Sequence, residues 1–475
     1  MTMNRFLALA GLCGLMLWIS GCATTTGLDL AQTVKAEPPG AGRRSIPSSE
    51  VFTAATVSIA TRPVPTAIEV PDLSTLPATQ AMRKEFEMPP DTDLWTRVRL
   101  GFALADLDGD LVLKWTQWYA SRPDYVQRMT ERGGRYLFHI VDEVARRGLP
   151  MELALLPFIE SAFNPQAMSS ARASGMWQFI PSTGRDFSLR QNVFRDDRRD
   201  VLASTRAALD YLQSLHSLLG DWHLALAAYN WGQGNVQRAV ARNLKAGLPA
   251  SYADLRMPDE TRNYLPKLQA VKNILARPEA FGLLLPPLAN HPYFVSVPIR
   301  QDIDVDVAAR WAGLSTENFR LLNPQLNKPV ILAGGTPQIL LPYDGATLFM
   351  DRIERAQGAM ASWTAWVAPR TLSAHDAARQ VGMTEARLRE VNAIPARMLV
   401  KQGSTLLVPR NVSQRLDVSA QVADEAALML APLRVAAPRK MVKSKAPTST
   451  AARKGAAPLR NAKAVPLGKQ RVATR

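Results

Sequence analysis

The stretch MELALLPFIESAFNPQAMSSARASGMWQFIPSTG, residues Met151–Gly184, is the most informative part of the sequence. Within it, Glu160 follows an unbroken apolar run, Leu153–Ile159, and precedes Ala162 and Phe163. A carboxyl group in such surroundings loses hydration, which favours its protonated form and raises its pKa. A carboxylic acid still protonated near neutral pH can give its proton to a leaving-group oxygen. A glutamate that ends a helix and points to water is the alternative, and the local pattern leaves both open.

The residues that follow combine small side chains with an amide and an aromatic ring. Gly175–Gln178, with sequence GMWQ, comes after a run of serines and alanines. This mixture is typical of a sugar-binding groove, in which Trp and Met contact ring faces and Gln bonds hydroxyl or acetamido groups. The pair Tyr229-Asn230 ends an apolar stretch and precedes two glycines, where both side chains can project into a cleft. A buried tyrosine with a satisfied hydroxyl is the alternative.

Apolar residues around these motifs recur at helical spacing. One stripe runs over 137–144 and is stopped by Gly148 and Pro150, and another runs over 202–218 and is stopped by Gly220. Helices with short turns between them therefore fill 91–280, which predicts one α-rich domain. A chain of 475 residues has room for about two further domains.

The order of the motifs resembles that of the lytic transglycosylases with a lysozyme-like domain. The matching residues are Glu160-Ser161, Gly175–Gln178, Ala227–Asn230 and the Glu260-Thr-Arg-x-Tyr264 segment. The resemblance implies an α+β fold, mostly helical and lysozyme-like (goose-type or soluble-lytic-transglycosylase-like), for a catalytic domain over 86–290. One departure is Trp231, where the family has a small residue; the indole could narrow a subsite or add a stacking face.

By this resemblance, Glu160 protonates the glycosidic oxygen between N-acetylmuramic acid and N-acetylglucosamine in peptidoglycan. It then takes the proton of the muramic O6 hydroxyl, which attacks its own C1 and gives a 1,6-anhydro end. Hydrolytic glycosidases use a second carboxylate about 5 to 9.5 Å away, which an internal hydroxyl does not need. The carboxylates that follow, Asp186, Asp196, Asp197 and Asp200, lie in an Arg-rich loop that we expect to be solvated. A muramidase that uses water stays open.

The resemblance also assigns substrate-binding residues around the acid. These are Ser161, Ser169, Met176, Gln178, Tyr229, Asn230, Glu260 and Tyr264. For both serines, Glu260 and Tyr264, a purely structural role stays open. No cofactor is implied, and no metal site is expected, because His216 and His223 lack a matching third ligand.

The C-terminal half contains an internal repeat. Residues 306–324 align with 375–393 at a constant offset of 69, and each copy lies between strand-like segments. The order strand, helix, helix, strand resembles LysM modules, which bind glycans containing N-acetylglucosamine, and predicts two small βααβ modules over 291–345 and 361–411. Both copies lack the usual Gly-Asp-Thr-Leu opening, so the fold is better supported than glycan binding.

The N-terminus resembles that of a bacterial lipoprotein. The apolar run Phe6–Ile19 is too short to cross a bilayer comfortably and ends at Ile19-Ser20-Gly21-Cys22. This predicts a signal peptide over 1–21, lipidation of Cys22 and a Pro-rich tether over 22–85. Ala23 favours an outer-membrane lipoprotein of a Gram-negative bacterium, facing the periplasm and attached to the membrane by its lipid. An uncleaved membrane anchor is the alternative.

The charge is concentrated at the other end. The segment 434–475 holds 12 Lys and Arg and no acid, out of a net charge of +16. A disordered basic tail suits lipopolysaccharide or phospholipid headgroups, although a solvated tail without a partner stays open. The near-neutral body and the export signal argue against nucleic acid as a partner. A catalytically inactive lipoprotein that only binds peptidoglycan is the competing function class.

Overall fold

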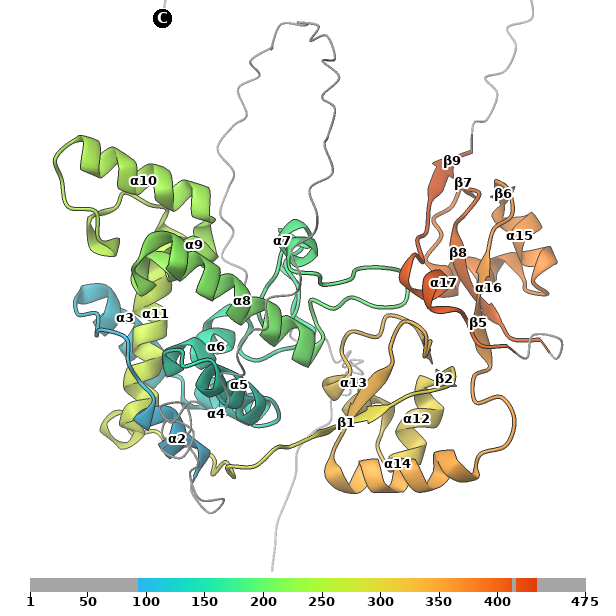
Figure 1. The fold of residues 1–475 in the computed structure, drawn as a ribbon, viewed down its shortest axis with the longest axis horizontal. Coiled ribbons are helices and arrows are strands. Elements are labelled where there is room, and N and C mark those ends of the chain that lie inside the picture. Colours follow the sequence, from blue (N-terminus) through green and yellow to red (C-terminus); the bar gives the residue numbers. More distant parts are fainter. Residues whose placement is uncertain (1–92, 412–415, 434–475) are drawn as a thin grey trace, which may run out of the picture.

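The computed structural model describes residues 93–411 and 416–433. The predicted signal peptide, Cys22, the tether and the basic tail lie outside these residues. A helical domain is followed by two modules of short strands and helices (Figure 1). Within the described ranges, no helix has both the length and the apolar character needed to cross a bilayer.

The helical domain consists of ten α-helices and three short 3-10 turns in the described part of the chain. These are α2 (Leu94–Leu100), α3 (Asp110–Ala120), α4 (Pro123–Gly133), α5 (Leu137–Arg146), η2 (Met151–Leu155), α6 (Leu156–Ser161), α7 (Pro181–Asp186), α8 (Val201–Leu219), α9 (Trp222–Trp231), α10 (Gln233–Lys245), η3 (Tyr252–Asp254), α11 (Asp259–Ala276) and η4 (Pro278–Phe281).

Helices α8 and α9 each begin at a capping aspartate. The Asp200 side chain accepts a hydrogen bond from the backbone of Ala203 at the start of α8, and Gly220 ends that helix with a left-handed backbone. Asp221 caps α9 in the same way, through the backbone of Leu224. Helix α11 packs against α3, α6 and α9, so it forms the centre of the domain and brings its own side chains beside the end of α6.

The two modules repeat one arrangement. The first contains β1 (Val295–Pro298), β2 (Ile303–Asp304), α12 (Val305–Trp311), α13 (Thr316–Leu322), β3 (Val330–Ile331) and β4 (Gln338–Leu341). The second contains β5 (Trp363–Val367), β6 (Leu372–Ser373), α15 (Ala374–Gln380), α16 (Glu385–Asn392), β7 (Met398–Val400) and β8 (Thr405–Pro409). Strand β1 pairs antiparallel with β4, and β5 with β8, as the βααβ prediction requires.

A buried asparagine braces each module. Asn323 donates to the carbonyl of Leu340 at 2.8 Å and accepts from the same residue's amide at 2.8 Å. Asn392 makes the equivalent pair of bonds to Leu407, at 2.9 and 2.7 Å. The repeat seen in the sequence therefore extends to side-chain hydrogen bonds that close the module.

Three elements lie outside the repeat. Helix α14 (Tyr343–Arg355) follows the first module and packs on α12. After the second module come α17 (Ala420–Asp424) and β9 (Leu430–Pro432), which pairs antiparallel with β7. The C-terminal segment thereby widens the small sheet that begins with β6.

A long segment of the helical domain reaches out and contacts both modules. The segment between α7 and α8 extends from the helical domain toward α17 (Figure 1), and we call residues 189–199 the arm. At its tip, Phe194 is 4% exposed and packs in a cluster with Leu332 of the first module and Leu407 of the second. The backbone of Phe194 also accepts a hydrogen bond from Asn327 at 2.8 Å. The arm is therefore held between both modules.

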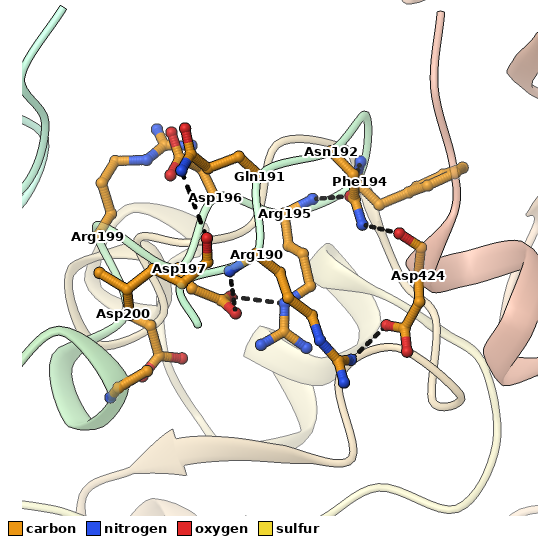
Figure 2. A network of polar contacts seen from close by, with 12 residues as sticks. Arg190, Gln191, Asn192, Phe194, Arg195, Asp196, Asp197, Arg199, Asp200 and Asp424 are labelled. Atoms are coloured by element: carbon orange, nitrogen blue, oxygen red, sulfur yellow. Dashed lines mark hydrogen bonds and ion pairs between the residues drawn. The ribbon is translucent and has the colours of Figure 1, made fainter. Parts of the chain in front are cut away.

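Polar contacts continue along the arm (Figure 2). Arg190 forms an ion pair with Asp424, and the Asn192 amide donates to the Asp424 carbonyl at 3.1 Å. Asp196 and Asp197 are 8% and 3% exposed and pair with the arm's own arginines. The expectation of a solvated loop at these two residues was wrong, because both carboxylates are buried against arginines of the arm and the Asp196 amide bonds to the Gln325 carbonyl of the first module.

Candidate active site

Glu160 lies in the last turn of α6, immediately before a sharp change of chain direction. Ala162 and Phe163 both have left-handed backbones, with φ of 49° and 55°, which is costly for residues other than glycine. Phe163 is fully buried and packs edge-on against Phe158, with ring centroids 4.5 Å apart. Packing of these rings therefore holds the turn that follows Glu160.

Helix α11 supplies the partner of the acid. The Tyr264 hydroxyl donates a hydrogen bond to Glu160 Oε1 at 2.6 Å. Glu160 itself is only partly buried, and within the described residues its Oε2 has no hydrogen-bond partner. One carboxyl oxygen is thus fixed by the protein, and the other is not bonded by any described residue.

The surroundings of Glu160 favour its protonated form. Burial raises the pKa of Glu160 to about 7, and the negative charge of Glu260 acts in the same direction. The Tyr264 hydrogen bond and the positive charge of Lys267 oppose this rise in pKa. The apolar run before Glu160 predicted a raised pKa, and the structure adds the residues that limit it.

The segment 173–179 packs beside the acid. The Ser161 hydroxyl donates to the Met176 carbonyl at 3.0 Å, and the Tyr229 hydroxyl donates to the Trp177 carbonyl at 2.8 Å. Gln178 has a left-handed backbone, with φ of 50°, and its amide donates to the Gly175 carbonyl at 2.7 Å. Burial and the charge of Glu160 raise the pKa of Tyr229 far above its ordinary value, so its phenol stays protonated.

The arm determines which residue can occupy position 175. Gly175 has φ of +85°, and a Cβ added there would lie 2.1 Å from the carbonyl oxygen of Arg198. The Arg198 guanidinium in turn donates to the carbonyls of Arg172 and Phe179, at 2.6 and 3.1 Å. The arm therefore contacts both ends of the segment that packs beside Glu160.

The remaining predicted residues differ in their burial and in their hydrogen bonds. Ser169 accepts from the backbone of Ala173 at 3.1 Å, and Asn230 accepts from the Thr261 hydroxyl at 2.8 Å. Glu260 is exposed at the start of α11. Met176 is 1% exposed and belongs to the hydrophobic core. Its contact with substrate stays a prediction.

Two further residues of this region belong to none of the sequence motifs. Lys267 lies on α11 after Tyr264, and its Nζ is 4.7 Å from the centroid of the Trp115 ring on α3. The Trp115 indole donates to Asn263 Oδ1 at 2.8 Å. Trp115 is distant in the sequence, whereas Lys267 could have been found from its helical spacing to Tyr264. Across the described ranges, no three His, Cys, Asp or Glu side chains gather as a metal site requires.

Comparison with known proteins places the site in a family. Residues 140–247 match the transglycosylase SLT domain, and residues 293–357 match the LysM-like domain of lytic transglycosylase MltD. The chain is 37% identical over 185 residues to a putative tributyltin chloride resistance protein of Alteromonas sp., covering 38% of this chain and 87% of that one. The chain therefore belongs to the transglycosylase SLT family. This confirms the lysozyme-like, mostly helical fold class.

Within that family, the combination with a LysM-like domain narrows the resemblance. The chain is 36% identical over 254 residues to membrane-bound lytic murein transglycosylase D of Escherichia coli K12, covering 53% of this chain and 56% of that relative. The chain thus spans about half the length of this relative. A solved structure, the 70 kDa soluble lytic transglycosylase SLT70 of Escherichia coli, overlaps 43% of each chain at 18% identity with a TM-score of 0.24.

Proposed function

We propose that this protein is a peptidoglycan lytic transglycosylase with Glu160 as its general acid and base. The observation that carries the proposal is the Glu160 carboxyl group, partly buried, with one oxygen bonded to Tyr264 at 2.6 Å and a pKa raised to about 7. Membership of the transglycosylase SLT family supports the same reaction class.

The reaction needs one carboxyl group acting twice. Protonated Glu160 gives its proton to the glycosidic oxygen as the bond from that oxygen to muramic C1 breaks. The resulting carboxylate takes the proton of the muramic O6 hydroxyl as O6 bonds to C1. The N-acetylglucosamine chain leaves with a new hydroxyl, and the 1,6-anhydro ring forms without water. The acid ends protonated again, and tethering of O6 supplies a high effective concentration.

The buried aspartates of the arm support a mechanism with a single catalytic carboxyl group. Asp196 and Asp197 are paired with arginines and occupied by hydrogen bonds, so neither is free to hold a water molecule. Glu260 is the carboxylate whose charge raises the pKa of Glu160, and it is exposed. This makes Glu260 the residue on which a water-using muramidase, the second candidate, would depend.

Mass spectrometry of digested peptidoglycan separates these functions. Purified wall treated with the full chain should yield 1,6-anhydromuramic ends, and Glu160→Gln should abolish them while Glu131→Gln, an exposed glutamate on α4, should not. Reducing muramic ends that disappear in Glu260→Gln would establish the muramidase instead. Absence of any product, together with retained binding to the wall, would establish an inactive peptidoglycan-binding protein.

We also propose that the enzyme is an outer-membrane lipoprotein that acts on the wall from the periplasmic side. The Cys22 motif supports the anchor, and the relative named as membrane-bound is consistent with it. In a fractionation test, Cys22→Ser should leave an unprocessed precursor or release the protein from membranes. Normal processing and membrane association of this variant would refute the anchor. The two modules would bind glycan and raise the local concentration of enzyme on the wall.

A further inference from the structure

Helix α11 carries a lysine without a carboxylate partner beside the acid. Lys267 follows Tyr264 by three residues and Glu260 by seven, a spacing that places all three on one face of the helix. Its ammonium contacts the ring of Trp115, and within the described residues it makes no hydrogen bond or ion pair. By contrast, Lys272 on the same helix is paired with Asp106 at 2.7 Å.

This lysine is partly removed from water. Burial lowers the pKa of Lys267, while the charges of Glu260 and Glu160 act against that shift. A partly desolvated ammonium whose partner is an aromatic face has, among the described residues, no protein acceptor for its three N–H groups. An anionic ligand group would supply them, and its arrival would also displace the remaining water.

Two tryptophans of α3 lie beside this lysine. Trp115 is fixed by its hydrogen bond to Asn263, one turn before Lys267, and Trp118 meets it edge-on with ring centroids 5.7 Å apart. Both indoles are only partly buried. Helix α3, which carries them, lies outside the 140–247 range that matches the family. An aromatic surface next to Lys267 therefore borders the face of α11 whose Tyr264 bonds to Glu160.

We propose that Lys267, positioned on Trp115, binds the lactyl carboxylate of an N-acetylmuramic acid residue from which the peptide stem has been removed, and so favours stem-free glycan at the site. The inference rests on the proposed function and adds a specificity-determining residue to it. Where a peptide stem is attached, this carboxyl group forms an amide and is uncharged, whereas removal of the stem leaves a carboxylate. N-acetylglucosamine has no such group, so a cation beside the acid distinguishes a stem-free muramic residue from it.

The test is a binding comparison in full-length protein carrying Glu160→Gln, so that no ligand is cleaved. The probes are a peptide-free tetrasaccharide of alternating N-acetylglucosamine and N-acetylmuramic acid, and chitotetraose, which has no lactyl group. Adding Lys267→Met should weaken the muramic ligand about tenfold, the value of a charge-assisted hydrogen bond, and leave chitotetraose unchanged. Lys267→Arg should restore most of the preference.

Lys114→Met is the matched control, because Lys114 is exposed and lies beside the same Trp115 ring, at 5.7 Å from its centroid. It should leave both affinities unchanged. Equal weakening of both ligands by Lys267→Met, or no weakening of either, would overturn the inference. Wall digestion by the protein with native Glu160 is measured in parallel, so an inactive enzyme is recognised separately as failure of the proposed function.

Discussion

Replacing Glu160 by Gln should stabilise the protein while it removes catalysis. The pKa of Glu160 is raised from 4.5 to about 7 in the folded state by burial. Each unit of difference between folded and unfolded states corresponds to about 1.4 kcal/mol. The full difference corresponds to roughly 3 kcal/mol, and solvent access to the partly exposed side chain reduces the expected effect to about 2 kcal/mol.

The sign follows from where the proton is held. Below about pH 4.5 the carboxyl is protonated in both states, so Gln and Glu differ little in charge. Between about pH 4.5 and 7 the unfolded chain has released its proton while the folded protein retains it, so the free energy of unfolding of the native protein falls as pH rises. Above pH 7 the folded protein bears the full free-energy cost of ionising the buried Glu160 carboxyl. Glutamine is neutral at every pH and does not have this cost.

Urea unfolding at pH 4 and pH 8, followed by tryptophan fluorescence, measures this difference. Glu160→Gln should be about 2 kcal/mol more stable than the native protein at pH 8 and close to it at pH 4. Glu131→Gln, which removes an exposed carboxylate, should show no such pH dependence. An equal excess stability at both pH values, or none at pH 8, would refute the claim that the acid is held protonated by burial.

Three further changes test the contacts around the acid. Tyr264→Phe removes the hydrogen bond that lowers the pKa of Glu160, so the alkaline limb of kcat/KM against pH should move upward by about one pH unit. The control, Tyr252→Phe, loses a buried hydroxyl that donates to the Thr261 carbonyl and should leave that limb in place. Gly175→Ala should destabilise the domain by about 3–5 kcal/mol in thermal unfolding, because its Cβ would meet a backbone carbonyl; melting unchanged from native would contradict this placement. Phe194→Ala should weaken docking of the arm by about 3 kcal/mol, seen as faster amide exchange over 189–199, and exchange as slow as in the native protein would show that the arm is held otherwise.

Local sequence predicted the acid well and its partners poorly. The apolar run before Glu160 is contiguous in sequence, so its desolvation could be inferred without a fold. The Tyr264 hydroxyl reaches Glu160 from 104 positions away, and only the packing of α11 on α6 brings them together. The family resemblance named Tyr264 but left its role open. A contact between residues so far apart in the chain cannot be predicted from the local spacing of residues in the sequence.

The modules were predictable for a different reason. The repeat at an offset of 69 marks two units of equal length, and buried Asn323 and Asn392 at equivalent positions show why both copies keep the same turn. Composition misled the prediction at the arm, where alternating arginines and aspartates are typical of a solvated loop. The Gln325 carbonyl that accepts from the Asp196 amide lies more than a hundred residues later, and the position of its module on the arm could not be read from the sequence of the arm.

The arm also changes what the modules can be expected to do. From the sequence, all proposed catalytic residues precede the repeats, which predicts that the modules only tether the enzyme to its polymer. In the structure, Phe194 at the tip of the arm is buried between the modules, and Arg198 at its base bonds the carbonyls of Arg172 and Phe179. A segment that is tightly packed at both ends passes a displacement at one end on to the other. The arm is packed in this way, at Phe194 and at Arg198. Removing the modules would therefore expose Phe194 and free one end of the arm. We expect this to displace the segment beside Glu160 as well as to weaken binding to the wall.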